Sequence, residues 1–172
     1  MSNGTGPARL RDTPGGVTRV LSCTVDFRDY DTRLAAYALI VDDQERVLLA
    51  RWNEGSEPQW TMPGGGVELD ETPAEGAVRE LREETGYDVD LLQVLGVDTF
   101  LVPAEDRIEP PGRPLKSVRV VYEARIVGGE LRHEENGTTD EARWVPLSEV
   151  SSLRRVSLVD AALALRESGV QV

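Results

Sequence analysis

Apolar and polar residues alternate along several stretches of the 172-residue chain, a pattern that predicts strands. Residues 34–41 and 46–52 are two apolar runs on either side of the polar tetrapeptide 42–45, which is typical of a hairpin. Further extended segments are expected at 17–27, 60–62, 89–102, 117–127 and 143–145. The proline-rich residues 103–114 are expected to form a loop.

The clearest helix signal covers residues 73–85. Thr72 suits the N-cap, Pro73 suits the first helical position, and Glu75 completes a Thr-x-x-Glu capping box. Gly86 suits the residue just past the helix end. The sequence therefore predicts a well-defined helix in the middle of the chain.

A last amphipathic helix is expected to begin at Ser157, which would cap it. Apolar residues recur there at helical spacing, at Leu158, Ala161, Ala162 and Leu165. Many strands, one central helix and one terminal helix predict an α+β fold, an α/β/α sandwich with a mixed sheet between helices. The strict alternation of a doubly wound fold is absent from this pattern.

Two sides of the helix at 73–85 differ in chemistry. One stripe is apolar and is expected to face the core, at Ala74, Ala77, Val78 and Leu81. Glu80, Glu83 and Glu84 lie on a separate arc, so that their carboxylates converge within one turn. Gly76 lies on the same arc and costs about 1 kcal/mol relative to alanine, which calls for either room for a ligand or a close backbone approach.

Three carboxylates on one turn repel one another, and a hard cation removes that penalty. Ligands that are all oxygen suit Mg²⁺ or Mn²⁺. The alternative interpretation is a solvated acidic face.

The spacing around these glutamates resembles the signature of the Nudix hydrolases. From Gly65 the chain has five residues, then Glu71, then seven residues, and then the segment 79–87, Arg-Glu-Leu-Arg-Glu-Glu-Thr-Gly-Tyr. The segment Trp60-x-x-Pro63-Gly64-Gly65 and the tripeptide Arg143-Trp144-Val145 are also similar to that family. The resemblance covers about 35–164 and implies a Nudix fold.

This resemblance implies a Mg²⁺-dependent attack of water on a diphosphate joined to a further group. The metal ligands would be Glu80, Glu83 and Glu84, with the carbonyl of Gly65 or its neighbour. Glu71 and Arg79 would orient the loop on the helix, unless they form only a surface salt bridge.

The general base stays open at this point, with Glu84 and Glu141 as the candidates. Glu134, Glu135 and Asp140 compete with Glu141 for that role.

Substrate binding is predicted at Arg51, Trp52, Gly65 and Gly66. Pro103 resembles a proline found near that place in ADP-ribose-cleaving members of the family, and the extra strand before the hairpin resembles that of nucleotide-sugar-cleaving members, where it can help to form a dimer. The resemblance therefore implies a nucleoside diphosphate derivative of the ADP-ribose or nucleotide-sugar type, and a homodimer. The alternatives are a (d)NTP pyrophosphohydrolase and a non-catalytic module that senses nucleotides.

Composition narrows these possibilities. The chain has 31 acidic and 19 basic residues, a net charge of −12, which argues against a nucleic-acid partner. Cys23 is the only cysteine and is expected to be a buried thiol, so that no intrachain disulfide forms. Residues 1–16 are expected to be a flexible tail without a signal peptide. One domain is expected to follow at 17–172. The longest apolar run is too short to span a membrane. A cytoplasmic protein is expected.

Overall fold

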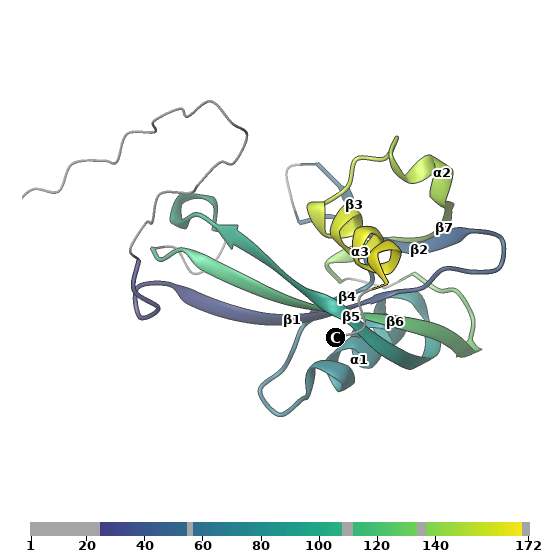
Figure 1. Ribbon diagram of the computed structural model, residues 1–172, viewed down its shortest axis with the longest axis horizontal. Helices are drawn as coiled ribbons and strands as arrows, with labels where there is room; N and C mark the ends of the chain where they lie inside the picture. Colours follow the sequence, from purple (N-terminus) through teal and green to yellow (C-terminus); the bar gives the residue numbers. More distant parts are fainter. Residues whose placement is uncertain (1–24, 55–56, 108–111, 134–136, 170–172) are drawn as a thin grey trace, which may run out of the picture.

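The computed structural model describes residues 25–54, 57–107, 112–133 and 137–169 (Figure 1). The tail predicted at 1–16 and the buried thiol predicted at Cys23 lie outside these residues. The strand predicted at 17–27 also lies mostly outside them, and its described end, residues 25–27, forms no strand.

Two β-sheets form the centre of the molecule. The larger is mixed and has the strand order β4-β1-β6-β5. In it, β1 (Asp31–Leu39) runs parallel to β6 (Leu115–Gly129) and antiparallel to β4 (Gly64–Gly66), and β5 (Tyr87–Val102) runs antiparallel to β6. The smaller sheet is antiparallel, with β2 (Arg46–Trp52) between β3 (Gln59–Thr61) and β7 (Thr139–Pro146).

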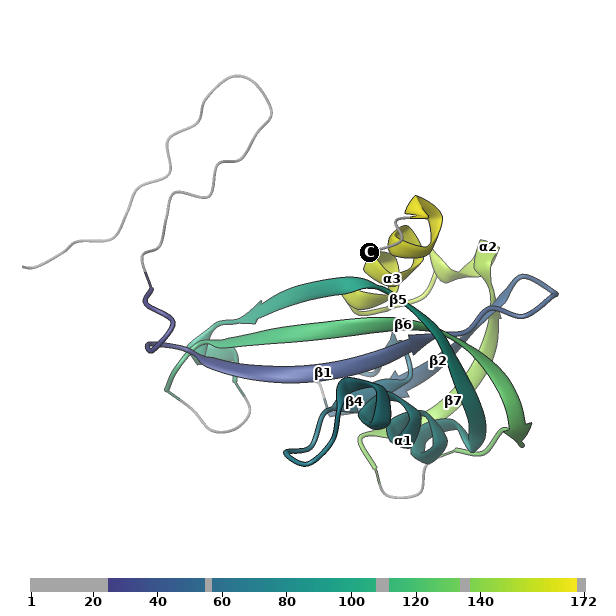
Figure 2. The ribbon, with the colours of Figure 1, turned by 60° about the horizontal axis from the view of Figure 1, so that its bottom comes forward.

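Helices cover both sides of these sheets (Figure 2). The long helix α1 (Pro73–Thr85) lies on one side, and α3 (Ser157–Ser168) lies on the other. The short helix α2 (Leu147–Val150) follows β7, and a 3₁₀ helix, η1 (Ala104–Asp106), follows β5. The predicted mixed sheet between helices is confirmed, with a second, smaller sheet beside it.

The predicted hairpin is wrong in its pairing, although both of its strands exist. β1 and β2 belong to different sheets, and the two predicted runs pair only next to the turn, through a bridge between Val41 and Val47 and a hydrogen bond from the Leu48 N–H to the Ile40 carbonyl (3.1 Å). Each strand finds a longer partner elsewhere: all nine residues of β1 pair with β6. The turn itself is held by Asp42, which accepts hydrogen bonds from Arg46 through its backbone N–H (2.9 Å) and Nε (2.8 Å).

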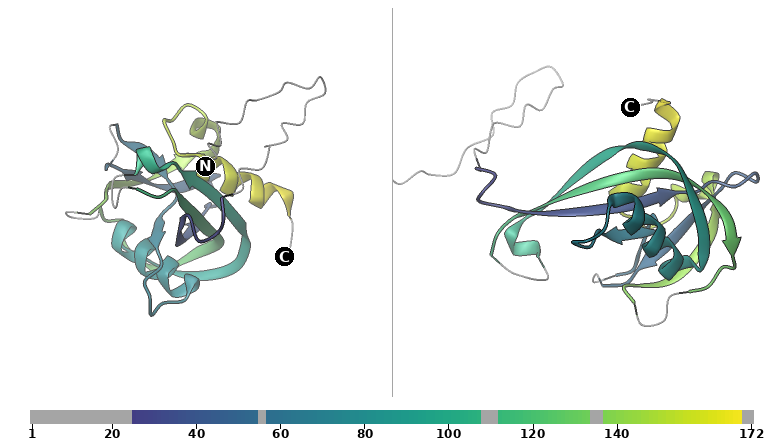
Figure 3. Two further views of the ribbon diagram at one scale, coloured as in Figure 1. Left: turned by 90° about the vertical axis from the view of Figure 1, so that its left-hand side faces the viewer. Right: turned by 90° about the horizontal axis from the view of Figure 1, so that it is seen from below.

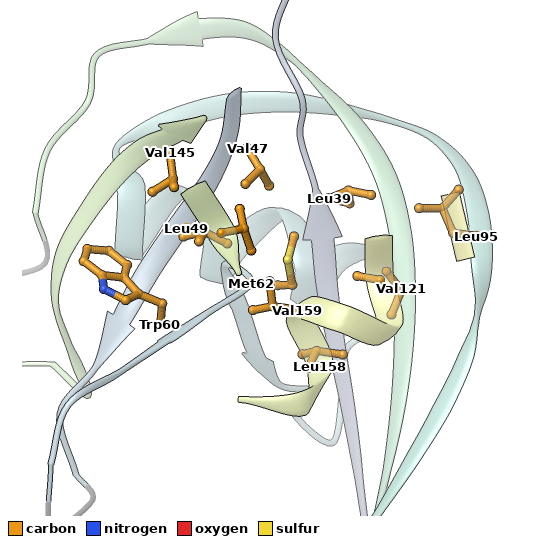
Figure 4. Close-up of a cluster of buried hydrophobic side chains, with 12 residues drawn as sticks. Leu39, Val47, Leu49, Trp60, Met62, Leu95, Val121, Val145, Leu158 and Val159 are labelled. Atoms are coloured by element: carbon orange, nitrogen blue, oxygen red, sulfur yellow. The ribbon is translucent and has the colours of Figure 1, made fainter. Parts of the chain in front are cut away.

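The core lies on both faces of β2. Val47 and Leu49 point into one cluster, beside Trp60 of β3 and Leu158 of α3 (Figure 4). Leu48, between them, packs on the opposite side in the cluster that contains Leu81 of α1. A strand buried on both faces needs consecutive apolar residues, which explains the unbroken run in β2.

Helix α1 begins as predicted. Thr72 accepts a hydrogen bond from the Glu75 N–H, and the capping box is complete. The predicted apolar stripe is only partly buried, because Ala77 and Leu81 are fully buried while Val78 is 36% exposed.

Helix α3 begins differently from the prediction, because its N-cap is Val156 rather than Ser157. The Val156 N–H donates to the Trp60 carbonyl (3.0 Å), which joins the start of α3 to β3, and no side chain caps the helix.

The sheet of β1, β6 and β5 extends well past both helices as a three-stranded arm (Figure 3). In the described part of the chain, no helix has the length and apolar character needed to cross a membrane.

Candidate active site

The glycine strand β4 brings backbone close to the acidic side of α1. It pairs with β1 at the edge of the larger sheet, with Gly64 opposite Tyr37 and Gly65 opposite Ala36. Gly64 has φ 133°, and a Cβ there would lie 2.3 Å from the Ala36 carbonyl oxygen. Only glycine allows this approach.

Two of the three predicted glutamates lie against this strand. Glu84 is 4% exposed, and its Oε2 accepts a hydrogen bond from the Gly64 N–H (2.9 Å). The Glu80 carboxylate lies beside Gly65, where an added Cβ would be 2.8 Å from its Cδ and Oε1. The side chain of Glu83 is more open, at 52% exposed.

Arg79 joins the loop, the glycine strand and the helix. Its Nε and Nη2 donate to the two oxygens of Glu71 (2.5 and 3.0 Å), and Nη2 also donates to the Gly66 carbonyl (3.1 Å). Its Nη1 lies 3.1 Å from Glu80 Oε1 and 3.1 Å from Glu83 Oε2. Arg79 is therefore the centre of an ionic network. It does not form only the single surface salt bridge that the sequence analysis considered as the alternative.

This network changes the ionisation of its members. The Arg79 guanidinium and the Glu68 N–H together lower the pKa of Glu71 to about 2. In turn, the hydrogen bond with Glu71 raises the pKa of Arg79. Both groups stay charged at neutral pH, which keeps the loop fixed to the helix.

Gly76 allows the loop to pack on α1. A Cβ at this buried position would lie 3.2 Å from Glu71 Oε2 and 3.4 Å from Val67 Cγ2. The sequence offered two explanations for a glycine inside this helix, room for a ligand and close approach of the backbone. The structure shows the close approach of another chain segment.

Arg51 and Glu141 pair with each other on the smaller sheet. They are direct cross-strand neighbours, and Arg51 Nη1 lies 2.9 Å from Glu141 Oε2. Arg51 Nε also donates to Asp140 Oδ1 (2.8 Å), a bond that lowers the pKa of Asp140. Arg51 is thus already held by two carboxylates.

The remaining predicted site residues are dispersed. Trp52 Nε1 donates to Glu54 Oε2 (3.3 Å). Trp60 is buried in the core, where the Arg143 guanidinium lies 4.3 Å from its ring centroid. Glu134 and Glu135 lie outside the described residues.

Two residues near the glycine strand were missed by the sequence analysis. Arg33 lies against Gly66, where an added Cβ would be 3.0 Å from its Nη2. Burial raises the pKa of Tyr37, on which the charges of Arg33 and of Glu84 act in opposite directions. Only the pairing of strands distant in sequence brings these residues to the site, and no local motif signals it.

Within the described residues, no three histidine, cysteine or acidic side chains already converge as a metal site. The donors that the motif supplies are nevertheless oxygens of glutamates and of a glycine carbonyl, which suit a hard divalent cation.

The sequence model of the NUDIX domain family matches residues 31–164 of this chain. The chain belongs to the Nudix family. Its fold is similar to that of a NUDIX hydrolase from Nitrosomonas europaea, with a TM-score of 0.68 and 18% identity over 81% of this chain and 90% of that one. The predicted Nudix fold is thereby confirmed.

Two Nudix relatives have names that state an activity. An ADP-ribose pyrophosphatase from Methanocaldococcus jannaschii is 31% identical over 70% of this chain and 65% of that protein. An RNA pyrophosphohydrolase from Halorhodospira halophila is 47% identical over 68% of this chain and 70% of that protein. The chain spans only 33%, 42% and 40% of the length of three other curated relatives.

Proposed function

We propose that the protein is a Nudix hydrolase that cleaves the phosphoanhydride bond of a nucleoside diphosphate linked to a further group, of the ADP-ribose or nucleotide-sugar type. The observation that carries this proposal is the placement of the motif carboxylates. The carboxylates of Glu80 and Glu84 lie against the glycine strand, and Arg79 joins that strand, the loop and the helix. The name of the M. jannaschii relative supports this substrate class.

Nudix hydrolases generally use divalent metal ions, and the donors here fit Mg²⁺ or Mn²⁺. Glu80, Glu83 and Glu84 would hold the ion together with the Gly65 carbonyl, because the Glu80 carboxylate and Gly65 are already in contact. A bound Mg²⁺ neutralises phosphate oxygens and makes a bound water more acidic.

The protein itself contributes positioning. Arg79 fixes Glu71 and the Gly66 carbonyl, so that the loop cannot swing away from the helix. The Gly64 N–H fixes one oxygen of Glu84. Rigid carboxylates of this kind orient both the ion and the water that attacks the substrate.

Glu84 and Glu141 are the two candidates for the group that accepts the proton of that water. Glu84 Oε2 accepts a hydrogen bond from the Gly64 N–H, and Glu141 forms an ion pair with Arg51. An ionised carboxylate is the form that a general base requires. Glu141→Gln therefore separates the two: turnover is lost if Glu141 is the base and retained if Glu84 is.

Three alternatives are outcomes of the same experiment. They are a (d)NTP pyrophosphohydrolase, a module that senses nucleotides without cleaving them, and an enzyme that acts on RNA, as the name of the H. halophila relative states for that protein. The net charge of −12 opposes RNA, because a polyanion is repelled by an acidic protein.

The test is a substrate panel of ADP-ribose, nucleotide sugars, dinucleoside polyphosphates, (d)NTPs and 5′-triphosphorylated RNA. Products are identified with Mg²⁺, with Mn²⁺ and with a chelator. We expect cleavage of a nucleoside diphosphate derivative to a nucleoside monophosphate, with loss of activity in the chelator. Preferred cleavage of (d)NTPs or RNA would replace the proposed substrate class, and no turnover of any compound would favour the sensor.

Variants of α1 test the carboxylates. Glu83→Gln and Glu84→Gln are each expected to lower kcat by about 10² or more. Glu75→Gln is the matched control on the same helix, because glutamine also completes a capping box. Equal losses in all three variants would refute the assignment of ligands.

A further inference from the structure

The long strand β5 forms an outer edge of the larger sheet. In the order β4-β1-β6-β5 it has a neighbouring strand, β6, on one side only. Its second half runs along the part of the sheet that extends past both helices (Figure 2). In the described part of the chain, no segment other than β6 forms backbone hydrogen bonds with residues 97–102. The outer side of this segment therefore presents backbone N–H and C=O groups that another strand can pair with.

Residues 97–102 are the regular part of this edge. Register shifts interrupt the pairing of β5 with β6 at 91–93 and at 94–96. Helix α3 packs on the sheet at Gly96, where an added Cβ would lie 2.7 Å from Leu165 Cδ2. Beyond that point, each residue from 97 to 102 pairs with β6 without a shift. Bulges, prolines and lysines protect natural sheet edges, and residues 97–102 contain none of these.

Large apolar side chains stand along the same segment. Val97 is 58% exposed and Leu101 is 62% exposed, and the register places both on the face of the sheet that α1 covers farther along. Phe100 is 46% exposed on the other face. Exposed apolar residues on an open strand edge are typical of a surface that pairs with another chain.

The charge of this segment suits a second copy of the same chain. The net charge of −12 makes two copies repel each other over most of their surface. Asp98 is the one charged residue at 97–102, and Arg119 neutralises it by donating hydrogen bonds from Nε (2.8 Å) and Nη2. Two acidic chains can therefore meet at this edge without placing like charges opposite each other.

We propose that the protein forms a homodimer in which the β5 strands of two copies pair in antiparallel fashion through residues 97–102. A two-fold axis perpendicular to the sheet joins the two larger sheets into one and keeps each face continuous, so paired residues must come from the same face. An axis at Thr99 places Val97 opposite the partner's Leu101, and Thr99 opposite the partner's Thr99. Apolar side chains then cover each other across the new strand pair.

This interface is separate from the strand predicted at 17–27, on which the sequence analysis based its expectation of a homodimer. It is also small. A short strand pair that covers Val97, Phe100 and Leu101 removes roughly 1,000 Å² from solvent in the two copies together, which is at the low end for specific interfaces. We therefore expect a reversible dimer with a Kd of about 10 µM.

Sedimentation of the full chain from about 1 µM to about 100 µM measures this equilibrium. We expect the mass to rise with concentration from that of one chain, 18.9 kDa, toward that of two. Val97→Lys is expected to raise Kd by at least about tenfold, because a lysine on an edge strand opposes pairing. Val127→Lys is the matched control, since Val127 is 56% exposed, lies at the other end of β6 from the arm and gains the same charge. It is expected to leave Kd within about twofold of wild type.

A disulfide tests the register of the pairing. In a Cys23→Ser background, Thr99→Cys places two thiols opposite each other with Cβ atoms about 5 Å apart. Oxidised glutathione is therefore expected to yield a covalent dimer. Thr32→Cys in the same background is the control, because Thr32 is an exposed threonine on the same face but lies on β1, two strands away from the edge.

Three results would overturn the proposal. A wild-type chain that stays monomeric up to about 100 µM would show that this edge does not self-associate, and a lowered Tm of Val97→Lys in that monomer would show that the chain itself covers it. A dimer that Val97→Lys and Val127→Lys weaken equally would place the interface elsewhere. Equal cross-linking of Thr99→Cys and Thr32→Cys would refute the pairing at Thr99. None of these measurements uses turnover, so the outcome is independent of the proposed hydrolase function.

Discussion

Gly65→Ala separates the geometry of the site from the stability of the fold. The backbone at Gly65 has an ordinary φ, so alanine is allowed there. Its Cβ would lie 2.8 Å from both Cδ and Oε1 of Glu80, and 2.9 Å from Oε2. Normal contact of such atoms requires about 3.4 Å, so the carboxylate must move by about 0.6 Å.

That movement is small for the fold but large for a metal ligand. Glu80 is a flexible side chain and can rotate away, while alanine lowers the entropy of the unfolded chain. We expect the free energy of unfolding to change by less than about 1 kcal/mol. Metal–ligand distances tolerate only about 0.2 Å, and misplacement by 1 Å can cost about 10² in rate. We therefore expect kcat/KM to fall by about 10².

The measurement combines thermal unfolding with turnover of the best substrate across a range of Mg²⁺ concentrations. Gly128→Ala is the control, because it is also on a strand with an ordinary φ and its Cβ would lie at a normal 3.4 Å from the nearest atom. Full activity of Gly65→Ala would refute the role of Glu80 at this position. A large drop in Tm would show instead that Gly65 is needed by the fold.

Three further predictions concern stability. Gly64→Ala would place a Cβ 2.3 Å from a backbone oxygen and should lower the free energy of unfolding, measured with denaturant, by more than about 3 kcal/mol. Gly112→Ala, at φ 119° with open space around it, should lower it by only about 1 kcal/mol through backbone strain, and equal losses would contradict the clash at Gly64. Leu81→Ala, at a fully buried position, should cost about 3 kcal/mol, and a loss under 1 kcal/mol would mean that α1 is not packed as described. Because the pKa of Glu71 is lowered from 4.5 to about 2, the stabilisation of the fold by ionised Glu71 is complete above about pH 4.5 and is lost as the pH falls toward 2. The Tm difference between wild type and Glu71→Gln should therefore shrink over that window, and a constant difference would speak against the ion pair with Arg79.

Local signals were enough to predict α1 and the positions of its glutamates along the helix. The capping box at Thr72 and Glu75 and the glycine at 86 describe a helix that depends only on its own residues. The three glutamates follow from the period of that helix. The apolar runs likewise located β2 and β5, because a strand buried on both faces, or a long paired strand, needs β-forming residues wherever its partner comes from.

The partners of these elements were decided only by the tertiary structure. The turn at Asp42 predicted that β1 would pair with β2. Instead, all nine residues of β1 pair with β6, a strand about eighty residues later, and the two predicted runs pair with each other only beside the turn. The burial of Glu84 could not be predicted for the same reason, because the hydrogen bond that it accepts comes from Gly64, on a strand twenty residues earlier in the chain. The alignment of Arg33 with Phe100 across the larger sheet likewise exists only through that register. Helical periodicity is a property of a short segment, whereas sheet pairing is settled by competition among all the strands of the chain.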